Sequence, residues 1–431
     1  MNQEILELLA EKKYSAVKQL IGQMEEADLA KLFEELENEE DADQFNRLFR
    51  LLPKETAAEV FSYMEPEIQE KIVRTLTDTE LQHILDDLFM DDYVDLVEEM
   101  PANVVKRVMQ NTTLANRKLI NQYLKYPEDS AGSLMTNEYV YFRSGITVAK
   151  AFEIIREYGV DKETIYTCYV TSSRKELLGV VTVRSLLLAR DSQLVSDVME
   201  DGVISVATGT DQEEAVRLLQ RYGFLSLPVV DAEGRLVGIV TVDDAMDVIE
   251  EETTEDFEKM AAMLPSDKPY LRTGVIATWK SRLPWLMILM LSATFTGMIL
   301  NHYENALAAC LVLNAYIPML SGTGGNSGTQ ASVAVIRALS LDEVDFSDVL
   351  KVLWKELRVS LLCGLCLAGA NFVKMLVVDR TLLGNAEVTP MVCLVVCLTV
   401  LFVVVFAKCV GCSLPLLAEK VGLDPAVMAS P

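Results

Sequence analysis

The sequence Gly322-Thr-Gly-Gly-Asn-Ser-Gly-Thr-Gln330 lies within a run from Asn305 to Ile336 that contains no Asp, Glu, Lys or Arg. A run of this length is typical of a membrane-spanning segment, because about 20 apolar residues cross a bilayer. Four of the residues 322–328 are glycine, and each glycine costs a helix about 1 kcal/mol relative to alanine. Irregular backbone at membrane depth is tolerated only where it is packed in protein or lines a watery cavity. The stretch therefore predicts a broken helix beside a permeation path.

Three more apolar segments accompany this run. Residues 283–303 precede it, and residues 359–378 and 388–418 follow it. Lys and Arg gather before the first segment and between the second and third, which places both clusters in the cytoplasm by the positive-inside rule. We therefore predict an α-helical transmembrane bundle, residues 276–431, that crosses the cell membrane several times and keeps the preceding half of the chain cytoplasmic. The clustered bases are Arg272, Lys280, Arg282, Arg337, Lys351, Lys355 and Arg358.

The sequence ends soon after the fourth apolar segment. Leu423-Asp-Pro-Ala426 is a typical start of another helix, since proline is favoured in a first turn. Few residues follow it before Pro431. We expect a fifth transmembrane helix that is cut off at Pro431.

Acidic residues are concentrated before Leu271. The net charge is −26, yet the part from Leu271 onward holds 10 Asp and Glu against 11 Lys and Arg. The earlier part therefore carries all of the net negative charge, which argues against nucleic acid as a partner and favours cations. The same composition is expected if the acids only keep a domain soluble. The positions of the acids in the chain therefore have to distinguish cation binding from solubility.

Residues 1–132 are expected to form short amphipathic helices with an internal repeat. Asp43-Gln-Phe-Asn-Arg-Leu-Phe-Arg-Leu-Leu-Pro53 resembles Asp91-Asp-Tyr-Val-Asp-Leu-Val-Glu-Glu-Met-Pro101 in its acid, aromatic, apolar pair and proline. Each proline would lie in the first turn of the next helix, where its missing N–H costs little. The pattern predicts an α-helical repeat domain whose units bury their faces against each other.

Residues 133–248 contain a clearer repeat. Leu177-Leu-Gly-Val-Val-Thr-Val183 matches Leu236-Val-Gly-Ile-Val-Thr-Val242. In each copy a helix, predicted at 148–158 and at 211–222, leads to a strand, a polar turn and this second strand. Strand, turn and strand bounded by helices form an α/β unit, here made twice. Residues 227–244 are similar to the second half of a CBS-domain pair.

Residues 249–275 are predicted to be an acidic connecting helix. Like charges at three- and four-residue spacing destabilise an isolated helix. A solvated linker and a helix that awaits cations both fit this composition. The acids in and just before this segment are Asp247, Glu250, Glu251, Glu252, Glu255, Asp256 and Glu258.

Taken in this order, the helical repeats, the CBS pair, the acidic helix and the Gly-Thr-Gly-Gly-Asn segment resemble the MgtE family of magnesium channels and transporters. The resemblance covers nearly the whole chain, and residues 322–337 are its most specific piece. It implies a homodimer in the lipid bilayer that carries Mg²⁺, with the second and fifth helices of each subunit lining the pore. Family members have a filter aspartate on the fifth helix, and no residue before Pro431 matches it.

The physical chemistry of Mg²⁺ fits the glycine segment. Mg²⁺ takes oxygen ligands and gives up its water reluctantly, so a pore should offer oxygens to a hydrated ion. Gly324 and Gly325 would turn backbone carbonyls toward the lumen, and Asn326 would add an amide oxygen. By resemblance, Asp424 would lie near the cytoplasmic mouth. The alternative is that the glycines only let helices approach closely.

The resemblance also implies that the acidic half is a Mg²⁺ sensor. Its carboxylates would repel one another at low Mg²⁺ and be bridged by divalent ions at high Mg²⁺, which would hold the connecting helix across the cytoplasmic mouth. Each ion shifts this equilibrium by its differential affinity for the two states. The implied ligands are Asp91, Asp95, Asp211, Glu213, Asp244, Asp247, Glu252, Glu255 and Asp256.

Several alternatives also fit the sequence. Thr241 followed by an acid resembles the CBS pattern that holds the ribose of ATP, and an ordinary strand-to-helix turn fits equally well. A transporter of Co²⁺ or Mn²⁺ and a membrane-tethered CBS sensor without a complete pore compete with a Mg²⁺ channel. An enzyme is not expected, because the sequence contains no P-loop and its two histidines, His83 and His302, have no nucleophile or metal-ligand pattern around them.

Overall fold

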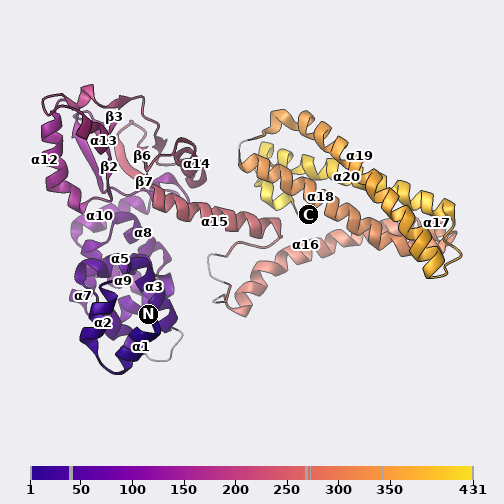
Figure 1. Cartoon of the computed structure of the whole chain (residues 1–431), viewed down its shortest axis with the longest axis horizontal. Coiled ribbons are helices and arrows are strands. Elements are labelled where there is room, and N and C mark those ends of the chain that lie inside the picture. Colours follow the sequence, from indigo (N-terminus) through magenta and orange to yellow (C-terminus); the bar gives the residue numbers. More distant parts are fainter. Residues whose placement is uncertain (1, 38–41, 267–269, 272, 342, 430–431) are drawn as a thin grey trace. The chain divides into compact units, whose positions relative to one another are not determined.

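The computed structural model describes residues 2–37, 42–266, 270–271, 273–341 and 343–429. The chain divides into two compact units, Met1–Ile249 and Glu250–Pro431 (Figure 1). Arg272, one of the predicted cytoplasmic bases, lies outside the described residues.

The first unit opens with short helices, as the repeat predicts. The helix starts follow the prolines: Pro53 and Pro101 are the N-caps of α5 and α9, and Pro66 begins α6. The helices are α1 (Asn2–Ala10), α2 (Tyr14–Ile21), α3 (Glu26–Glu37), α4 (Ala42–Phe49), α5 (Lys54–Ser62), α6 (Pro66–Thr75), α7 (Asp78–Asp87), α8 (Met90–Glu99), α9 (Ala102–Asn111) and α10 (Leu114–Tyr123).

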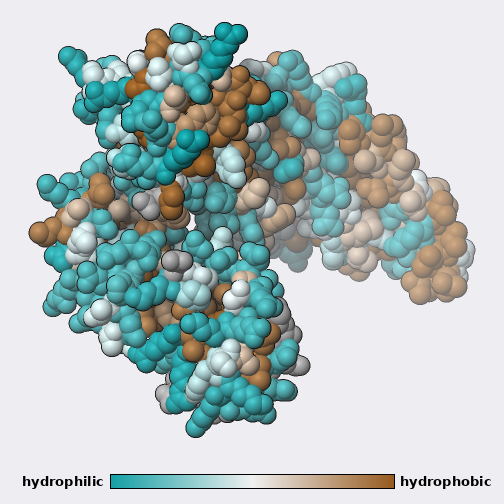
Figure 2. All heavy atoms as spheres, turned by 60° about the vertical axis from the view of Figure 1, so that its left-hand side comes forward, coloured by the Kyte–Doolittle hydropathy of each residue, from teal (hydrophilic) through white to brown (hydrophobic). Residues whose placement is uncertain are grey.

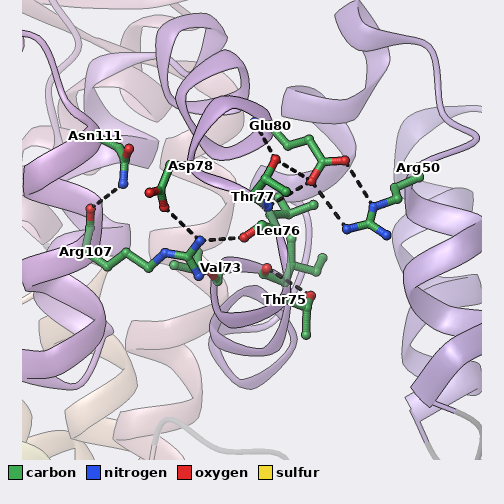
Figure 3. Close-up of polar contacts among 10 residues, drawn as sticks. Arg50, Val73, Thr75, Leu76, Thr77, Asp78, Glu80, Arg107 and Asn111 are labelled. Carbon is green, nitrogen blue, oxygen red and sulfur yellow. Dashed lines mark hydrogen bonds and ion pairs between the residues drawn. The ribbon is translucent and has the colours of Figure 1, made fainter.

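Polar contacts tie these helices together where they end (Figure 3). Arg107 of α9 donates to the backbone carbonyls of Val73 and Leu76, both at 2.5 Å, and pairs with Asp78 at 3.1 Å. The last carbonyls of a helix have no partner within it, so Arg107 satisfies the end of α6 and joins it to α7. This contact therefore joins α9 to the end of α6 and the start of α7.

The α/β part of the first unit contains two similar sheets. In each, a parallel pair of strands is followed by an antiparallel pair, giving the orders β1-β2-β3-β4 and β5-β6-β7. The predicted α/β repeat is confirmed. Its elements are α11 (Ala131–Leu134), β1 (Tyr139–Arg143), α12 (Val148–Tyr158), β2 (Thr164–Thr171), β3 (Leu177–Thr182), α13 (Val183–Leu188), β4 (Glu200–Asp201), β5 (Val206–Ala207), α14 (Gln212–Tyr222), β6 (Ser226–Val230) and β7 (Leu236–Thr241).

One hydrophobic core joins the helical repeat to the second sheet. It runs from the N-terminal helices through Tyr93 and Val94 of α8 to Leu227 and Val240 of the sheet. Helix α15 (Val242–Met260) starts directly at the end of β7. The core therefore fixes α8 and the start of α15 as parts of one body.

The second unit is a bundle of long helices, and the predicted helical membrane part is confirmed. Among the residues that the structure describes, three stretches are long and apolar enough to cross a membrane: Val275–His302, Phe346–Leu382 and Pro390–Val421. Figure 2 shows extended hydrophobic areas on these helices and a mainly hydrophilic surface on the first unit. The elements are α16 (Val275–His302), α17 (Glu304–Ala308), α18 (Ile317–Ser340), α19 (Val349–Lys374) with its π-helical continuation Met375–Leu382, α20 (Pro390–Val421) and the short turn η6 (Pro425–Met428).

The glycine segment does not break its helix, so that prediction was wrong. Helix α18 runs without interruption from Ile317 to Ser340. The reason is close packing against α20: a Cβ atom added to Gly411 would lie 2.4 Å from the carbonyl oxygen of Gly328, and one added to Gly324 would lie 2.7 Å from Val403. Small residues let membrane helices approach in this way, and an unbroken helix satisfies its own backbone groups.

Candidate functional site

A polar stripe runs along the side of α18 that does not contact α20. Gly325, Asn326 and Thr329 are exposed in a single copy of the chain, whereas Gly324 is buried. Their three- and four-residue spacing places Asn326 and Thr329 on one face of the helix. Polar groups are expensive in lipid and usually face a bundle interior or a watery cavity. The sequence-based prediction therefore needs a correction: Gly324 faces α20, and Thr329, which we did not predict, joins Asn326.

Asp424 lies after α20 and has two partners. Its Oδ1 accepts a hydrogen bond from the backbone N–H of Ala426 at 2.8 Å and so caps η6. Its Oδ2 lies 2.7 Å from the ammonium of Lys259, in the last turn of α15. Next to this pair, Met260 packs against Ile336 of α18 and against Ala426. The end of the connecting helix is thus docked on the end of the helix that carries the polar stripe.

Carboxylates from three segments of the first unit face one another. Asp91 and Asp92 begin α8, Glu163 precedes β2, and Asp243 and Asp244 begin α15. We call these five residues the interdomain acid cluster. The common core of α8 and the second sheet brings them together.

Two oxygen atoms of the interdomain acid cluster are buried without a hydrogen-bond partner among the described residues: Asp91 Oδ1 and Glu163 Oε2. Leaving a buried polar atom unsatisfied costs about 1–3 kcal/mol, and more if it is charged. Such atoms call for a proton, a water or an ion. The cluster therefore has the properties of a site completed by a cation.

The pKa values of the cluster show the same shortage of positive charge. Burial raises the pKa of Asp92 to about 7, and the charges of Asp244 and Asp243 add to this. Burial raises the pKa of Glu163 to about 8, again with Asp243 and Asp244 contributing. The pKa of Asp244 rises to about 6 through burial, although a hydrogen bond from Thr241 opposes the shift. Burial and then Asp244 raise the pKa of Asp91 well above its ordinary value.

The donor atoms suit a hydrated divalent cation. Mg²⁺ prefers oxygen ligands and usually keeps several waters. Within the described ranges, no three His, Cys, Asp or Glu side chains converge into a finished coordination shell. The cluster thus has the negative charge and the unsatisfied oxygens that a hydrated divalent ion would need.

The structure brings together only some of the predicted ligands. Asp91 and Asp244 belong to the interdomain acid cluster, and Asp95 lies one turn further along α8. Asp92 and Asp243 are next to the predicted ligands Asp91 and Asp244 in the sequence, so they could have been predicted as ligands too. Glu163 could not, because it stands in a loop whose position depends on the tertiary fold.

The other predicted ligands have different neighbours. Asp211 caps α14 by accepting from the N–H of Glu213 at 2.9 Å, and Glu213 pairs with Arg217 at 2.5 Å. Glu255 of α15 lies 2.7 Å from the ammonium of Lys259. Asp247, Glu252 and Asp256 lie on the same helix.

Thr241 is buried at the end of β7 and donates to Asp244 at 2.5 Å. The threonine and the acid of the predicted nucleotide pattern are therefore neighbours. Asp244 also belongs to the interdomain acid cluster, so the same carboxylate serves both candidate sites.

Another buried charge pair lies between α19 and α20. Lys408 Nζ is 3.8 Å from Glu356 Oε2, and these side chains are 8% and 13% exposed. Lys408 directly follows Ala407, whose carbonyl oxygen would lie 3.4 Å from a Cβ atom added to Gly328 of α18. The pair therefore lies at the level where α18 and α20 approach most closely.

Three family models match successive parts of the chain. The MgtE intracellular N domain matches residues 24–129, the CBS domain matches residues 131–192 and 195–251, and a model described as divalent cation transporter matches residues 317–431. These matches follow the order of the helical repeat, the two α/β units and the membrane helices.

The chain is similar over almost its whole length to known transporters. It is 39% identical to the magnesium transporter MgtE of Thermus thermophilus and 31% identical to that of Bacillus subtilis, covering 99% of this chain and 92% of each relative. Among solved structures, the cytosolic domain of the Mg²⁺ channel MgtE in complex with ATP is 38% identical with a TM-score of 0.54, over 57% of this chain and all of that one. The soluble part of a magnesium transporter is 27% identical with the same TM-score, over 58% of this chain and 97% of that one.

Proposed function

Because the chain belongs to the MgtE family and transports magnesium across the membrane, we propose that its first unit senses Mg²⁺ and closes the pathway when the ion is abundant. The interdomain acid cluster carries this proposal. Its buried oxygens without partners and its raised pKa values mark a place where the folded protein lacks positive charge.

The gating step follows from electrostatics. Without divalent ions, the carboxylates of α8 and of the start of α15 repel one another, and this repulsion loosens their joint. A divalent ion bound there favours the compact arrangement by its differential affinity. Since α15 continues from this joint to the segment beside Asp424, its position couples the sensor to the inner mouth of the pathway. Asp95, Asp211, Glu213, Asp247, Glu252, Glu255 and Asp256 are proposed as further, weaker Mg²⁺ contacts.

The test is Mg²⁺ uptake into liposomes as the Mg²⁺ concentration on the side of the soluble unit is varied. The double variant Asp91→Asn, Asp244→Asn should raise the half-closing concentration by about tenfold or more, since allosteric coupling of this kind spans about 5- to 150-fold. The exposed residue Asp191 gives the matched control Asp191→Asn. A double variant that closes at the wild-type concentration contradicts the sensor.

For the pathway itself, we propose a pore between two copies of the chain. The polar stripe of α18 supports this, because Gly325, Asn326 and Thr329 are exposed in one copy although they belong to an apolar bundle. Pairing two such stripes would give a hydrated ion a polar wall and remove the stripes from lipid. Asp424 would stand at the cytoplasmic mouth. Gly324 is a packing residue behind this wall.

Substitution of Asn326 tests the pore. Asn326→Ala should lower Mg²⁺ flux about tenfold while the protein still elutes as a dimer, because one amide oxygen toward the hydrated ion is lost. Asn371 lies on α19 and contacts Met375 and Cys397 instead. If Asn371→Ala lowers flux as much as Asn326→Ala, the stripe does not line the pathway.

We further propose that ATP binds the CBS pair beside Thr241. The adjacent Thr241 and Asp244 support this, as does the similar cytosolic domain solved with ATP. Titration of the full chain with ATP should give saturable binding that Thr241→Ala weakens. Equal binding by Thr241→Ala would exclude this site. No catalytic role is proposed, and the transporter relatives favour that view.

A transporter of other divalent ions is the second candidate, because the model that matches residues 317–431 is described by that broader substrate class. The stripe of α18 offers carbonyl, amide and hydroxyl oxygens and has no His or Cys, which favours Mg²⁺ over softer metals. Competition by Co²⁺ and Mn²⁺ for Mg²⁺ uptake measures which description holds.

A further inference from the structure

We infer that Lys259 acts as a built-in cation that holds the connecting helix at the inner mouth without a bound metal ion. This inference rests on the gating function proposed above. It concerns one joint, between the end of α15 and the segment that follows α20, and both lie in the second unit.

The ammonium of Lys259 bridges two carboxylates that belong to different segments. It lies 2.7 Å from Glu255 Oε1, one turn back on α15, and 2.7 Å from Asp424 Oδ2 beyond α20. Both distances are those of charge-assisted hydrogen bonds. An ammonium has three donors, so it can serve both acceptors at once. Lys259 is 21% exposed, which places this bridge partly out of water.

An apolar contact holds the same end of the helix. Met260 packs against Ile336, near the end of α18, and against Ala426 and Ala429. The ionic contact of Lys259 and the apolar contact of Met260 therefore come from adjacent residues and fasten one helix end to one place. Removing the charge would leave the apolar contact in place, which makes the ionic part separately testable.

The role of Lys259 follows from its positive charge between the negative charges of Glu255 and Asp424. Without its ammonium, the Glu255 and Asp424 carboxylates would face each other across the joint, and closing it would need a cation from solution. With Lys259 in place, one ammonium lies between the two carboxylates and offsets their mutual repulsion from inside the protein. Docking of this end of α15 should therefore need no Mg²⁺ ion of its own, and the Mg²⁺ that closes the pathway should act at the interdomain acid cluster.

The test compares Lys259→Met with Lys259→Arg and with Lys280→Met, a control at an exposed lysine of α16. In the uptake assay, Lys259→Met should raise the half-closing Mg²⁺ concentration at least about fivefold and raise flux at nominally zero Mg²⁺. Lys259→Arg keeps the charge and should close as the wild type does. The double variant Lys259→Met, Asp424→Asn removes the repulsion between residues 255 and 424 and keeps a side chain that can cap η6. When flux is normalised to the maximum of each variant, this double variant should close at the wild-type Mg²⁺ concentration.

The outcomes separate this inference from the function on which it rests. If Lys259→Met closes as Lys280→Met does, while Asp91→Asn, Asp244→Asn loses its Mg²⁺ response, Lys259 is not a latch and the sensor stands. If the acid-cluster variant also closes normally, the sensor itself fails. If Lys259→Arg behaves like Lys259→Met, a positive charge is not what the joint needs, and the inference is overturned.

Discussion

The interdomain acid cluster and the contact between α15 and the segment after α20 both gather carboxylates from separate segments, but they balance the charge differently. At the end of α15, Lys259 lies 2.7 Å from both Glu255 and Asp424. In the cluster, buried oxygens of Asp91 and Glu163 have no hydrogen-bond partner among the described residues. In the proposed function the two places therefore have different tasks: the first uses the protein's own cation, and the second would take a cation from solution.

The largest expected effect concerns Glu356, another carboxylate that is paired with an ammonium group of the protein, that of Lys408. Lys408→Met leaves Glu356 buried without its counter-charge, and breaking a buried pair on one side costs about 3–5 kcal/mol. We expect a clear loss of thermal stability in detergent. The double variant Glu356→Gln, Lys408→Met should recover most of it, since neither charge remains.

Lys355→Met is the matched control, because Lys355 is exposed on the same helix as Glu356. A Lys408→Met protein as stable as this control would show that an internal ammonium is not what these carboxylates require.

A single substitution should give the interdomain acid cluster an internal cation like the one at the end of α15. Glu163→Lys places an ammonium within the interdomain acid cluster, opposite Asp243 and Asp244, whose charges act on residue 163. The variant should close at a Mg²⁺ concentration about tenfold lower, by the same coupling that a bound ion supplies. The measurement is uptake as a function of Mg²⁺, with Asp191→Lys as a control for total charge. Closure at an unchanged Mg²⁺ concentration would show that an ammonium group cannot replace a bound cation in the interdomain acid cluster.

The smallest expected effect is a pH dependence of the first unit. The folded pKa values of Asp244, Asp92 and Glu163 are about 6, 7 and 8, above their ordinary values because of burial. A raised carboxyl pKa contributes stability at low pH that is lost as pH rises through the folded pKa. Without Mg²⁺, limited proteolysis should therefore be a few-fold faster at pH 8 than at pH 6.

Mg²⁺ should remove most of that pH difference, because it favours the ionised carboxylates. A pH dependence that is the same with and without Mg²⁺ would mean that protons and Mg²⁺ do not compete for the cluster.

Local patterns predicted the elements well, and long-range contacts decided the sites. The repeat predicted helices at 148–158 and 211–222, and the structure has α12 at Val148–Tyr158 and α14 at Gln212–Tyr222. The helix through the glycine segment was mispredicted because the intrinsic helix propensity of glycine was considered without the packing partner. Gly324 and Gly328 pack against Val403, Ala407 and Gly411 of α20, about 80 residues later in the chain.

The sites show the same limit. Asp91 and Asp244 were predicted by resemblance, but Glu163 enters the cluster only through the fold. Lys259 is a single base in an acidic helix, and its partner Asp424 lies beyond all four long helices of the second unit's described part. No local pattern could have connected them.

The most direct test of the central claim is hydrogen–deuterium exchange of α8 and of residues 242–249 in the full-length chain. We predict that millimolar Mg²⁺ slows exchange in both segments, that NaCl of equal ionic strength does not, and that Asp91→Asn, Asp244→Asn abolishes the effect. Equal protection by NaCl, or Mg²⁺ protection that persists in the double variant, would contradict the claim that the interdomain acid cluster is closed by a divalent cation.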